Sequence, residues 1–160
     1  MKITAIFAST EDGAFGVSGG NGLPWGTSAP EDLQHFKNKT MGHAMIMGYN
    51  TYPGVAHLQG RDKIVITSKE ILAHPPSTYF ASSMEEAIMQ AVMLGHTEAF
   101  IIGGCKTLEQ HAHLAHEVLW SRIPGRYAAD TFIYLDKLLA DRHIKETQEL
   151  PDGTTVFTLV

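Results

Sequence analysis

Cysteine is nearly absent from this chain of 160 residues, in which Cys105 stands alone. No disulfide can form within the chain, and a reducing compartment fits such a composition. No residue beside Cys105 in the sequence marks a base that would activate a nucleophilic thiolate. We therefore expect Cys105 to be a small packed residue.

Long apolar runs are missing as well. The apolar run within residues 1–8 gives way at once to polar residues 9–12. It is too short for the core of a signal peptide followed by a cleavage site. No segment approaches the roughly 20 apolar residues of a membrane-spanning helix. The sequence therefore predicts a soluble, cytoplasmic protein without a membrane partner.

Basic residues are few and scattered. Lys and Arg together number 12 against 17 Asp and Glu, which gives a formal net charge of −5. Without a dense basic block, neither nucleic acid nor an anionic membrane is expected as the main partner. The length and the hydrophobic fraction of 44% are ordinary for a globular protein, and predict a single domain over residues 1–160.

The G-x-G-x-x-G fingerprint and the Walker A sequence are both absent, which excludes conventional Rossmann and P-loop sites. Three predicted strand ends nevertheless carry glycines, hydroxyls or free amides: Gly103-Gly104, residues 48–51 and residues 67–69. Glycines let the backbone approach a ligand, and a helix N-terminus offers N–H groups to phosphate. With Lys69 and Lys106 nearby, these ends could hold a dinucleotide that carries an extra phosphate. For Gly103-Gly104, a tight strand-to-helix turn is the alternative.

Apolar runs and turn residues divide the chain into alternating strands and helices. Strands are predicted at 2–9, 44–48, 62–67, 79–80, 98–102, 118–123, 142–149 and 154–160, and helices at 30–40, 50–55, 83–94 and 107–116. The glycine-rich residues 10–30 form a long loop, which in a compact domain is usually functional. The alternation predicts an α/β fold with a mainly parallel sheet covered on both faces, and the last hairpin adds an antiparallel edge. Ligands of such sheets bind at the carboxyl ends of strands.

Asp32 lies in the first turn of the helix predicted over 30–40, four residues before Phe36. The two side chains project from one helical face, which suits a flat, partly polar ligand. Alternatively, Asp32 merely complements the positive end of the helix dipole. Desolvation shifts a carboxyl pKa by as much as about 3–5 units, whereas the dipole is worth up to about 2 kcal/mol. We therefore predict a raised pKa for Asp32.

Three histidines, His111, His113 and His116, lie beside Glu117 and resemble a metal cluster in the sequence. On a helix, positions 113 and 116 share a face while 111 points elsewhere. No Cys or carboxylate grouping completes a tetrahedral set. We predict solvated histidines at a helix end and no metal site.

Seven short motifs, each modest alone, occur in a specific order: Ala-Phe-Gly at 14–16, Asn-Gly-Leu-Pro-Trp at 21–25, Asp-Leu-x-x-Phe-Lys at 32–37, Met-Ile-Met-Gly at 45–48 with Thr51, Gly-Arg at 60–61, Ile-Ile-Gly-Gly at 101–104 and Asp-Thr at 130–131. In this order and spacing the chain resembles the dihydrofolate reductase family over nearly its full length. The resemblance implies a three-layer fold with helices on both faces of the central sheet.

The resemblance also implies an activity. It is the NADPH-dependent reduction of 7,8-dihydrofolate to 5,6,7,8-tetrahydrofolate, by hydride transfer to C6 with protonation of N5. Such an enzyme supports one-carbon metabolism and thymidylate synthesis, and it binds antifolate-type inhibitors. A monomer is implied as well.

Site residues follow from the resemblance position by position. Asp32 would be the active-site acid, with Ser121 hydrogen-bonded to it; Leu23 and Trp25 would belong to a mobile loop over residues 16–25, which Asp130 helps hold shut. Arg61 would pair with the glutamate α-carboxylate of the substrate. The implied substrate-binding set is Ile6, Phe7, Ala8, Leu33, Phe36, Val55, Arg61 and Ile102. The implied cofactor-binding set is Ala8, Gly16, Gly48, Asn50, Thr51, Thr67, Ser68, Lys69, Gly103, Gly104, Cys105, Lys106 and Thr107, and the Gly103–Gly104 peptide bond is expected to be cis.

The chain departs from the bacterial pattern in three places. Six residues separate Trp25 from Asp32, Tyr49-Asn50 replaces a basic pair near the adenosine 2′-phosphate, and Cys105 stands where a third glycine is common. One alternative is a related reductase that acts on a pyrimidine intermediate of riboflavin synthesis, against which the Asp32 and Phe36 pair argues. Another is a dinucleotide-binding protein without turnover, against which Asp32 and Arg61 argue together.

Overall fold

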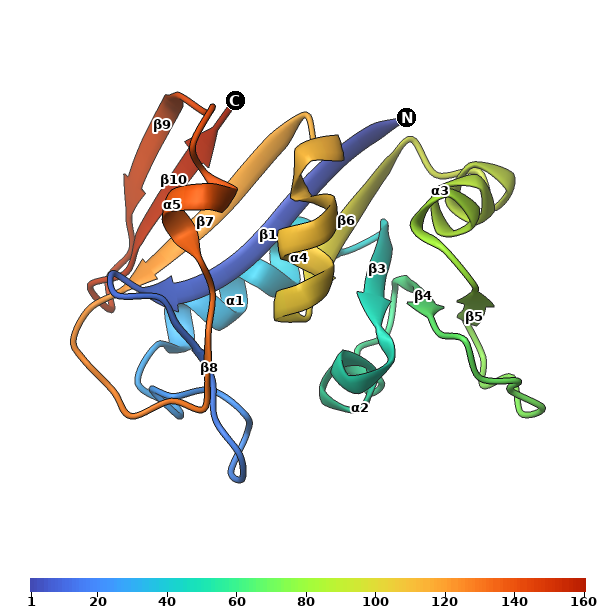
Figure 1. The fold of residues 1–160 in the computed structure, drawn as a ribbon, viewed down its shortest axis with the longest axis horizontal. Helices are drawn as coiled ribbons and strands as arrows, with labels where there is room; N and C mark the ends of the chain where they lie inside the picture. Colours follow the sequence, from blue (N-terminus) through green and yellow to red (C-terminus); the bar gives the residue numbers. More distant parts are fainter.

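A computed structural model describes all residues from 1 to 160. Its centre is an eight-stranded sheet with the strand order β5-β4-β3-β6-β1-β7-β10-β9 (Figure 1). The strands are β1 (Lys2–Thr10), β3 (Ala44–Gly48), β4 (Asp62–Ile66), β5 (Thr78–Ala81), β6 (Glu98–Gly103), β7 (Glu117–Ile123), β9 (Ile144–Glu149) and β10 (Thr155–Leu159). The first six strands in this order run parallel, while β10 is antiparallel to both β7 and β9. The predicted mainly parallel sheet with an antiparallel C-terminal edge is confirmed.

Five α-helices accompany the sheet: α1 (Pro30–Thr40), α2 (Tyr52–Val55), α3 (Met84–Met93), α4 (Cys105–His111) and α5 (Leu135–Leu138). Pro30 occupies the start of α1, where its missing N–H costs nothing. Ser83 caps α3 by accepting from the backbone N–H of Glu86, and Gly95 follows that helix with a φ of +90°. No helix is both long and apolar enough to cross a bilayer.

The strands bury alternate residues on two faces, which makes three layers. Odd-numbered residues of β1 join a core with α3 and α4, whereas Ile6 joins a second core that the partly buried Phe36 of α1 and Val55 of α2 cover. Figure 1 shows α4 in front of β1 and β6, with α1 behind them (Figure 1). The predicted helices on both faces are confirmed. Asp32 lies on α1, between that helix and the sheet.

Short elements depart from the sequence prediction. The loop over 10–30 contains a strand, β2 (Ala14–Gly16), which pairs with the unpredicted β8 (Thr131–Phe132). The helix predicted from residue 107 begins at Cys105 and ends at His111, after which residues 112–114 form a 3₁₀ turn. The helical residues 49–51 before α2 are likewise 3₁₀, and α5 was not expected. The three elements that were not predicted, β2, β8 and α5, have two to four residues each, too few to show a periodic pattern.

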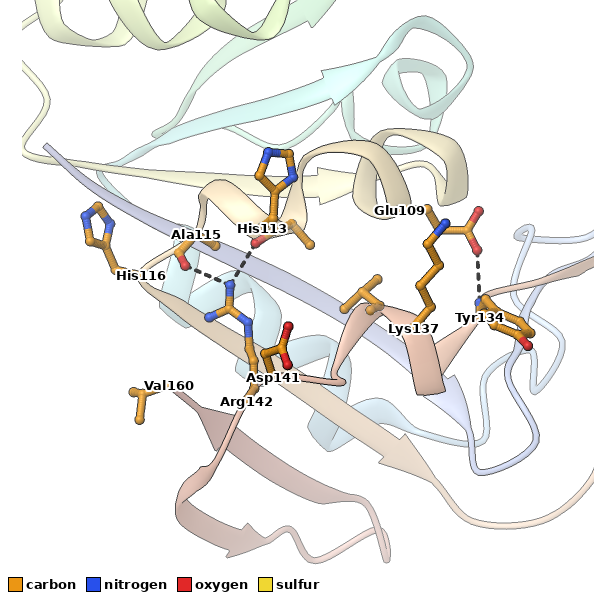
Figure 2. Close-up of a pocket in the computed structure, with 11 residues that line it drawn as sticks. Glu109, His113, Ala115, His116, Tyr134, Lys137, Asp141, Arg142 and Val160 are labelled. Atoms are coloured by element: carbon orange, nitrogen blue, oxygen red, sulfur yellow. Dashed lines mark hydrogen bonds between the residues drawn. The ribbon is translucent and has the colours of Figure 1, made fainter.

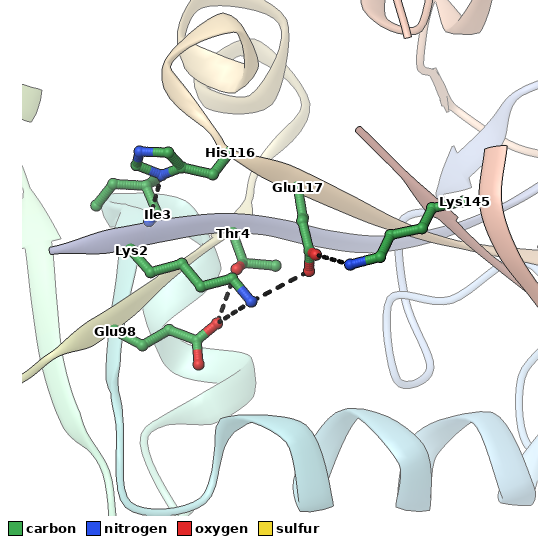
Figure 3. Close-up of polar contacts among 7 residues, drawn as sticks. All are labelled: Lys2, Ile3, Thr4, Glu98, His116, Glu117 and Lys145. Atoms are coloured by element: carbon green, nitrogen blue, oxygen red, sulfur yellow. Dashed lines mark hydrogen bonds and ion pairs between the residues drawn. The ribbon is translucent and has the colours of Figure 1, made fainter. Parts of the chain in front are cut away.

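The amino ends of the parallel strands are held by an ion-pair network (Figure 3). Lys2 of β1 lies 3.8 Å from Glu98 of β6 and 3.2 Å from Glu117 of β7. Lys145 of β9 reaches Glu117 at 3.2 Å, and the Thr4 hydroxyl donates to Glu98 at 2.8 Å. This network lies at the opposite end of the sheet from the carboxyl strand ends, and leaves those ends to ligands.

Candidate active site

Asp32 projects from the first turn of α1 onto the sheet. Its side chain is 8% exposed, and its Oδ1 atom is buried without any hydrogen-bond donor from the protein. Ser121 of β7, which interacts with Asp32 and is itself buried, pairs in register with Ala8 of β1. A buried polar atom without a partner is costly and rare in native proteins. The carboxylate is therefore suited to a ligand that brings its own donors.

Burial raises the pKa of Asp32 from 3.8 to about 6, so the predicted upward shift is confirmed. The Ser121 hydroxyl opposes the rise by hydrogen-bonding the carboxylate, and the negative charge of Asp152 adds to it. Desolvation is the largest of the three influences, because the charged carboxylate loses its hydration when it is buried between α1 and the sheet. The group therefore titrates close to neutral pH, where a catalytic acid is useful.

Because its pKa is raised, Asp32 contributes to the free energy of unfolding in a pH-dependent way: protonated Asp32 favours the folded state. The folded chain holds the proton more tightly than the unfolded chain, so this stabilisation is present below pH 3.8 and is lost as the pH rises through about 6. A shift of this size is worth about 3 kcal/mol. We expect Asp32→Asn to raise the free energy of unfolding at pH 8 by up to about 3 kcal/mol, with no gain near pH 3.5.

Urea unfolding of both proteins across this pH range measures the difference. Glu31→Gln is the matched control, because Glu31 is exposed in the same helical turn. The control should show no comparable gain. An Asp32→Asn gain that does not change with pH would contradict the ionisation argument.

Apolar residues from several elements gather on the same face as Asp32. Ile6 and Ile102 belong to the buried cluster against which Phe36 and Val55 pack, and Ala8 packs beside buried Trp25. Leu33 is exposed, at 47%, which leaves its side chain open to a ligand on the outer edge of α1.

The side chain of Phe7 does not face the side of the sheet on which the predicted substrate site lies. Its side chain lies in the opposite core, with its ring centroid 6.4 Å from that of Phe15, because successive residues of a strand face opposite sides. It therefore offers only backbone to the α1 side of the sheet.

Arg61 lies before β4 at the other end of α1. It is 5% exposed; its Nε donates to the Thr40 hydroxyl at 3.0 Å, and its two terminal nitrogens donate to the carbonyls of Lys37 and Gln59. Burial lowers the pKa of Arg61. No carboxylate of the protein pairs with it among the ion pairs of the structure. A fixed, charged guanidinium without an anionic partner suits a ligand carboxylate.

Glycines and threonines form a tight cradle where β3 and β6 end. A Cβ atom at Gly48 would lie 3.1 Å from the Thr107 hydroxyl oxygen, and one at Gly104 would lie 3.3 Å from that of Thr51. Gly103, at a φ of +145°, has a conformation that favours glycine, and the Gly103–Gly104 peptide bond is cis. The cradle thus leaves backbone and hydroxyl groups within reach of a phosphate, as a dinucleotide requires.

Beyond this cradle, the end of β4 meets the residues after β3. The Thr67 hydroxyl accepts from the backbone N–H of Lys69, and the ammonium of Lys69 lies 4.5 Å from the centroid of the Tyr49 ring. Ser68 and Asn50 are exposed beside them, and Lys106 is exposed in the first turn of α4. Lys69 thus places a cation beside Tyr49 and Asn50, neither of which is basic.

Cys105 opens α4, and its thiol donates to the carbonyl of Phe132 at 3.6 Å. Burial, followed by the charge of Glu109, raises the pKa of the thiol to about 11. The thiolate is therefore disfavoured at neutral pH, which supports packing over nucleophilic chemistry.

The loop over 16–25 is tied to Asp130. The backbone N–H of Asp130 donates to the Gly16 carbonyl at 2.8 Å, and its carboxylate accepts from the backbone N–H of Ser18. Trp25 is buried against Ala29 and Ile123, with Leu23 half-buried beside them. The loop is thus anchored at Trp25 and clasped at Gly16 and Ser18, with its glycine-rich tip between.

The histidines at the end of α4 do not converge. The backbone N–H of Ile3 donates to Nδ1 of His116 at 3.0 Å, and no group of three or more potential ligands is assembled in the structure. A cavity of about 570 Å³ lies nearby between α4 and α5 (Figure 2), where Arg142 donates to the carbonyls of Ala112 and Ala115 at 2.8 Å. Its lining includes two carboxylates, of Glu109 and Asp141, and two cations, of Lys137 and Arg142.

Two contributions to the site escape sequence reasoning. Asp152, in the turn between β9 and β10, accepts hydrogen bonds from the first turn of α1. Phe15 of β2 lies within reach of Gly103, since a Cβ there would be 3.9 Å from its ring. Neither contact has a local signal, because each joins segments far apart in the chain.

Comparison with known proteins places this geometry in a family. A family model described as dihydrofolate reductase matches residues 2–150. Dihydrofolate reductase of Neisseria meningitidis serogroup A is 35% identical over 135 residues, which cover 82% of this chain and 78% of that protein. Segregation and condensation protein A of Mycoplasmoides gallisepticum is 30% identical over 129 residues, but this match covers 79% of the chain and only 21% of that protein.

A solved structure shares the fold. It is a dihydrofolate reductase from Enterococcus faecalis complexed with NADP(H) and RAB-propyl, with a TM-score of 0.80 and 22% identity, and the match covers 99% of this chain and 95% of that one. The fold, the buried acid on α1 and the diglycine cradle thus agree with the family match over residues 2–150. This chain belongs to the dihydrofolate reductase family.

Proposed function

We propose that this chain catalyses the NADPH-dependent reduction of 7,8-dihydrofolate to 5,6,7,8-tetrahydrofolate, and so supports one-carbon metabolism and thymidylate synthesis. The observation that carries the proposal is the buried Oδ1 atom of Asp32, which has no donor within the protein. The amino-pyrimidine edge of a pterin presents two adjacent N–H donors, which match the two oxygens of a carboxylate. Antifolate-type inhibitors with the same donor edge would occupy the same site.

Asp32 also supports the protonation that the reaction needs. The pterin N5 is a weak base, and it must gain a proton before C6 accepts a hydride. A buried carboxylate stabilises the resulting cation more strongly than an exposed one would, because no water screens the charge. With a pKa of about 6, Asp32 can hold a proton and release it near neutral pH.

The cradle formed by Gly48, Thr51, Gly103, Gly104 and Thr107 suits the diphosphate of the cofactor, since a larger residue at Gly48 or Gly104 would fill it. Bound NADPH supplies the hydride that reduces the pterin. Phe36 and Val55 hold the ring of the substrate from opposite sides, and the loop that carries Leu23 excludes water when it closes. Alignment of the two ligands is the main contribution of these residues.

A direct assay tests the activity. Addition of dihydrofolate to the protein with NADPH should remove the absorbance of the reduced nicotinamide at a steady rate. Binding of NADPH without oxidation would overturn the enzymatic proposal in favour of a binding protein. Oxidation that occurs only with a ribosylamino-pyrimidine would overturn it in favour of the riboflavin branch.

The preference for NADPH over NADH is proposed to depend on Lys69. Its ammonium lies over the Tyr49 ring, where it can pair with the adenosine 2′-phosphate that NADPH carries and NADH lacks. We expect Lys69→Met to raise KM for NADPH about 10-fold or more, since one charge-assisted hydrogen bond is worth roughly 1.5–3 kcal/mol. KM for NADH should stay unchanged.

Steady-state rates with each cofactor measure this preference. Lys106→Met is the matched control, because it removes a second lysine beside the same cradle. If Lys106→Met alone changed the preference, the assignment to Lys69 would be wrong.

We also propose that residues 1–160 act as one domain, as a monomer and in the cytoplasm. One sheet runs through the chain and joins strands from residue 2 to residue 159, which supports a single folding unit. The lone cysteine suits a reducing compartment. Size-exclusion chromatography with light scattering tests the oligomeric state.

A further inference from the structure

The first turn of α1 is capped from a distant part of the chain. Oδ2 of Asp152, in the turn between β9 and β10, accepts from the backbone N–H of Glu31 at 3.0 Å and from that of Asp32 at 3.1 Å. The residue at the N-cap position of the helix is Ala29, which has no side-chain acceptor. The amides that a local Ser, Thr or Asp normally satisfies are thus satisfied across a separation of 120 residues.

The capping carboxylate is itself held in place. Its second oxygen, Oδ1, accepts from the backbone N–H of Thr154 at 3.0 Å. Backbone bonds from Gly153 to Leu150 and from Leu150 to Thr154 close the turn. After the turn, β10 pairs with β7 so that Val156 lies opposite Ser121. The strand that carries the cap is therefore joined to the strand that carries the hydroxyl beside Asp32.

Asp152 is also the charged group that acts on Asp32 from outside α1. From β7, Asp32 meets the Ser121 hydroxyl, and from the β9–β10 turn it meets the Asp152 carboxylate, whose charge raises the pKa of Asp32. On α1 itself, Glu31 is exposed, and His35 is half-buried one turn along. Partial burial acts to raise the pKa of Asp152, but hydrogen bonds from Thr154, Asp32 and Glu31 outweigh it and lower that pKa. Asp152 thus remains an anion while Asp32 titrates.

We propose that Asp152 is a positioning residue of this active site, whose carboxylate fixes the backbone of the first turn of α1 and with it the place and the charge environment of Asp32. The proposal rests on the proposed function for its catalytic consequence, but its structural part can be measured without turnover. Asp152 touches neither the pterin edge nor the cofactor cradle, and acts only through the amides and the field at Asp32.

Asp152→Asn is the decisive variant. Asparagine caps helices about as well as aspartate, so this change removes the charge and keeps an acceptor. Carbon-13 NMR of the Asp32 carboxyl in the ligand-free protein should show its titration midpoint shifted below that of the unchanged protein. Glu149→Gln removes one charge from the exposed part of the same hairpin and should leave the midpoint unchanged. The pH profile of turnover should shift in the same direction as the NMR midpoint.

Asp152→Ala tests the hydrogen bonds. Loss of a helix cap is worth about a fivefold change in an opening equilibrium, so the amides of Glu31 and Asp32 should exchange with solvent about fivefold faster. Turnover should fall while KM for NADPH is unchanged.

An unshifted Asp32 midpoint in Asp152→Asn would overturn the proposal, and this variant stays informative if Asp152→Ala does not fold. Shifted midpoints in a protein that does not reduce dihydrofolate would retain the positioning role and remove the proposed function.

Discussion

Asp32→Asn should lower the turnover of dihydrofolate by about 10²–10⁴-fold, the usual contribution of one positioned acid–base group. Asparagine has the shape of aspartate but neither its negative charge nor a titratable proton, so it can no longer stabilise a protonated N5. Its amide nitrogen would also face the donor edge of the pterin, where two donors repel. Affinity for NADPH should be retained, because the cofactor cradle is built from β3, β6 and the residues that follow them, and not from α1.

Single-turnover rates with prebound ligands give the loss of chemistry, and fluorescence titration with NADPH gives the cofactor affinity. The pH profile offers a second readout, since the transition expected near pH 6 in the unchanged protein should be missing from the variant. Asp136→Asn provides a matched acid-to-amide control, because this exposed carboxylate lies in α5, outside the loop and the proposed site. Equal losses of turnover and NADPH affinity in folded Asp32→Asn would contradict the assigned role.

Arg61→Leu should raise KM for dihydrofolate about 30-fold or more, because loss of one partner from a buried charge pair costs roughly 2–5 kcal/mol. The guanidinium is already oriented by Thr40, Lys37 and Gln59, so little entropy is lost when a carboxylate arrives. Arg61→Lys should recover only part of the affinity, because an ammonium cannot form two parallel bonds with a carboxylate.

The control for Arg61→Leu is a substrate without the glutamate carboxylate. Dihydropteroate, which lacks the glutamate, should show the same KM with the unchanged protein and with Arg61→Leu. A rise in KM for both substrates would point to a damaged α1 instead of a lost ion pair. Unfolding in urea separates the two effects, since Arg61 also donates to the Lys37 carbonyl and the Thr40 hydroxyl at the end of that helix.

Local signals in the sequence were sufficient to predict the helices and strands that carry the site. Pro30 marks the start of α1 and Ser83 that of α3, while apolar runs locate the buried strands β3 and β6. The pKa direction at Asp32 could be predicted because desolvation exceeds the dipole in range. These features depend on neighbours within a few residues, and such neighbours can be read from the chain.

Features that depend on pairing between distant segments could not be read in this way. The strand β2 exists because β8 lies beside it, although neither has more than three residues. Phe7 was placed in the pocket by the family resemblance alone, and the alternation of β1 directs its ring to the other core. The cap from Asp152 required the final hairpin to be folded back against α1.

Both ends of α1 are tied to other segments: Asp152 holds its opening amides, and Arg61 holds its closing carbonyl and hydroxyl groups. A helix fixed at its two poles has a set length, and from Asp32 to Thr40 that length is about 12 Å at 1.5 Å per residue. The carboxylate of Asp32 and the guanidinium of Arg61 are therefore held at a fixed separation. A ligand whose donor edge and carboxylate have the same separation can bind Asp32 and Arg61 together without a change in the protein. A shorter ligand can bind only one of the two residues.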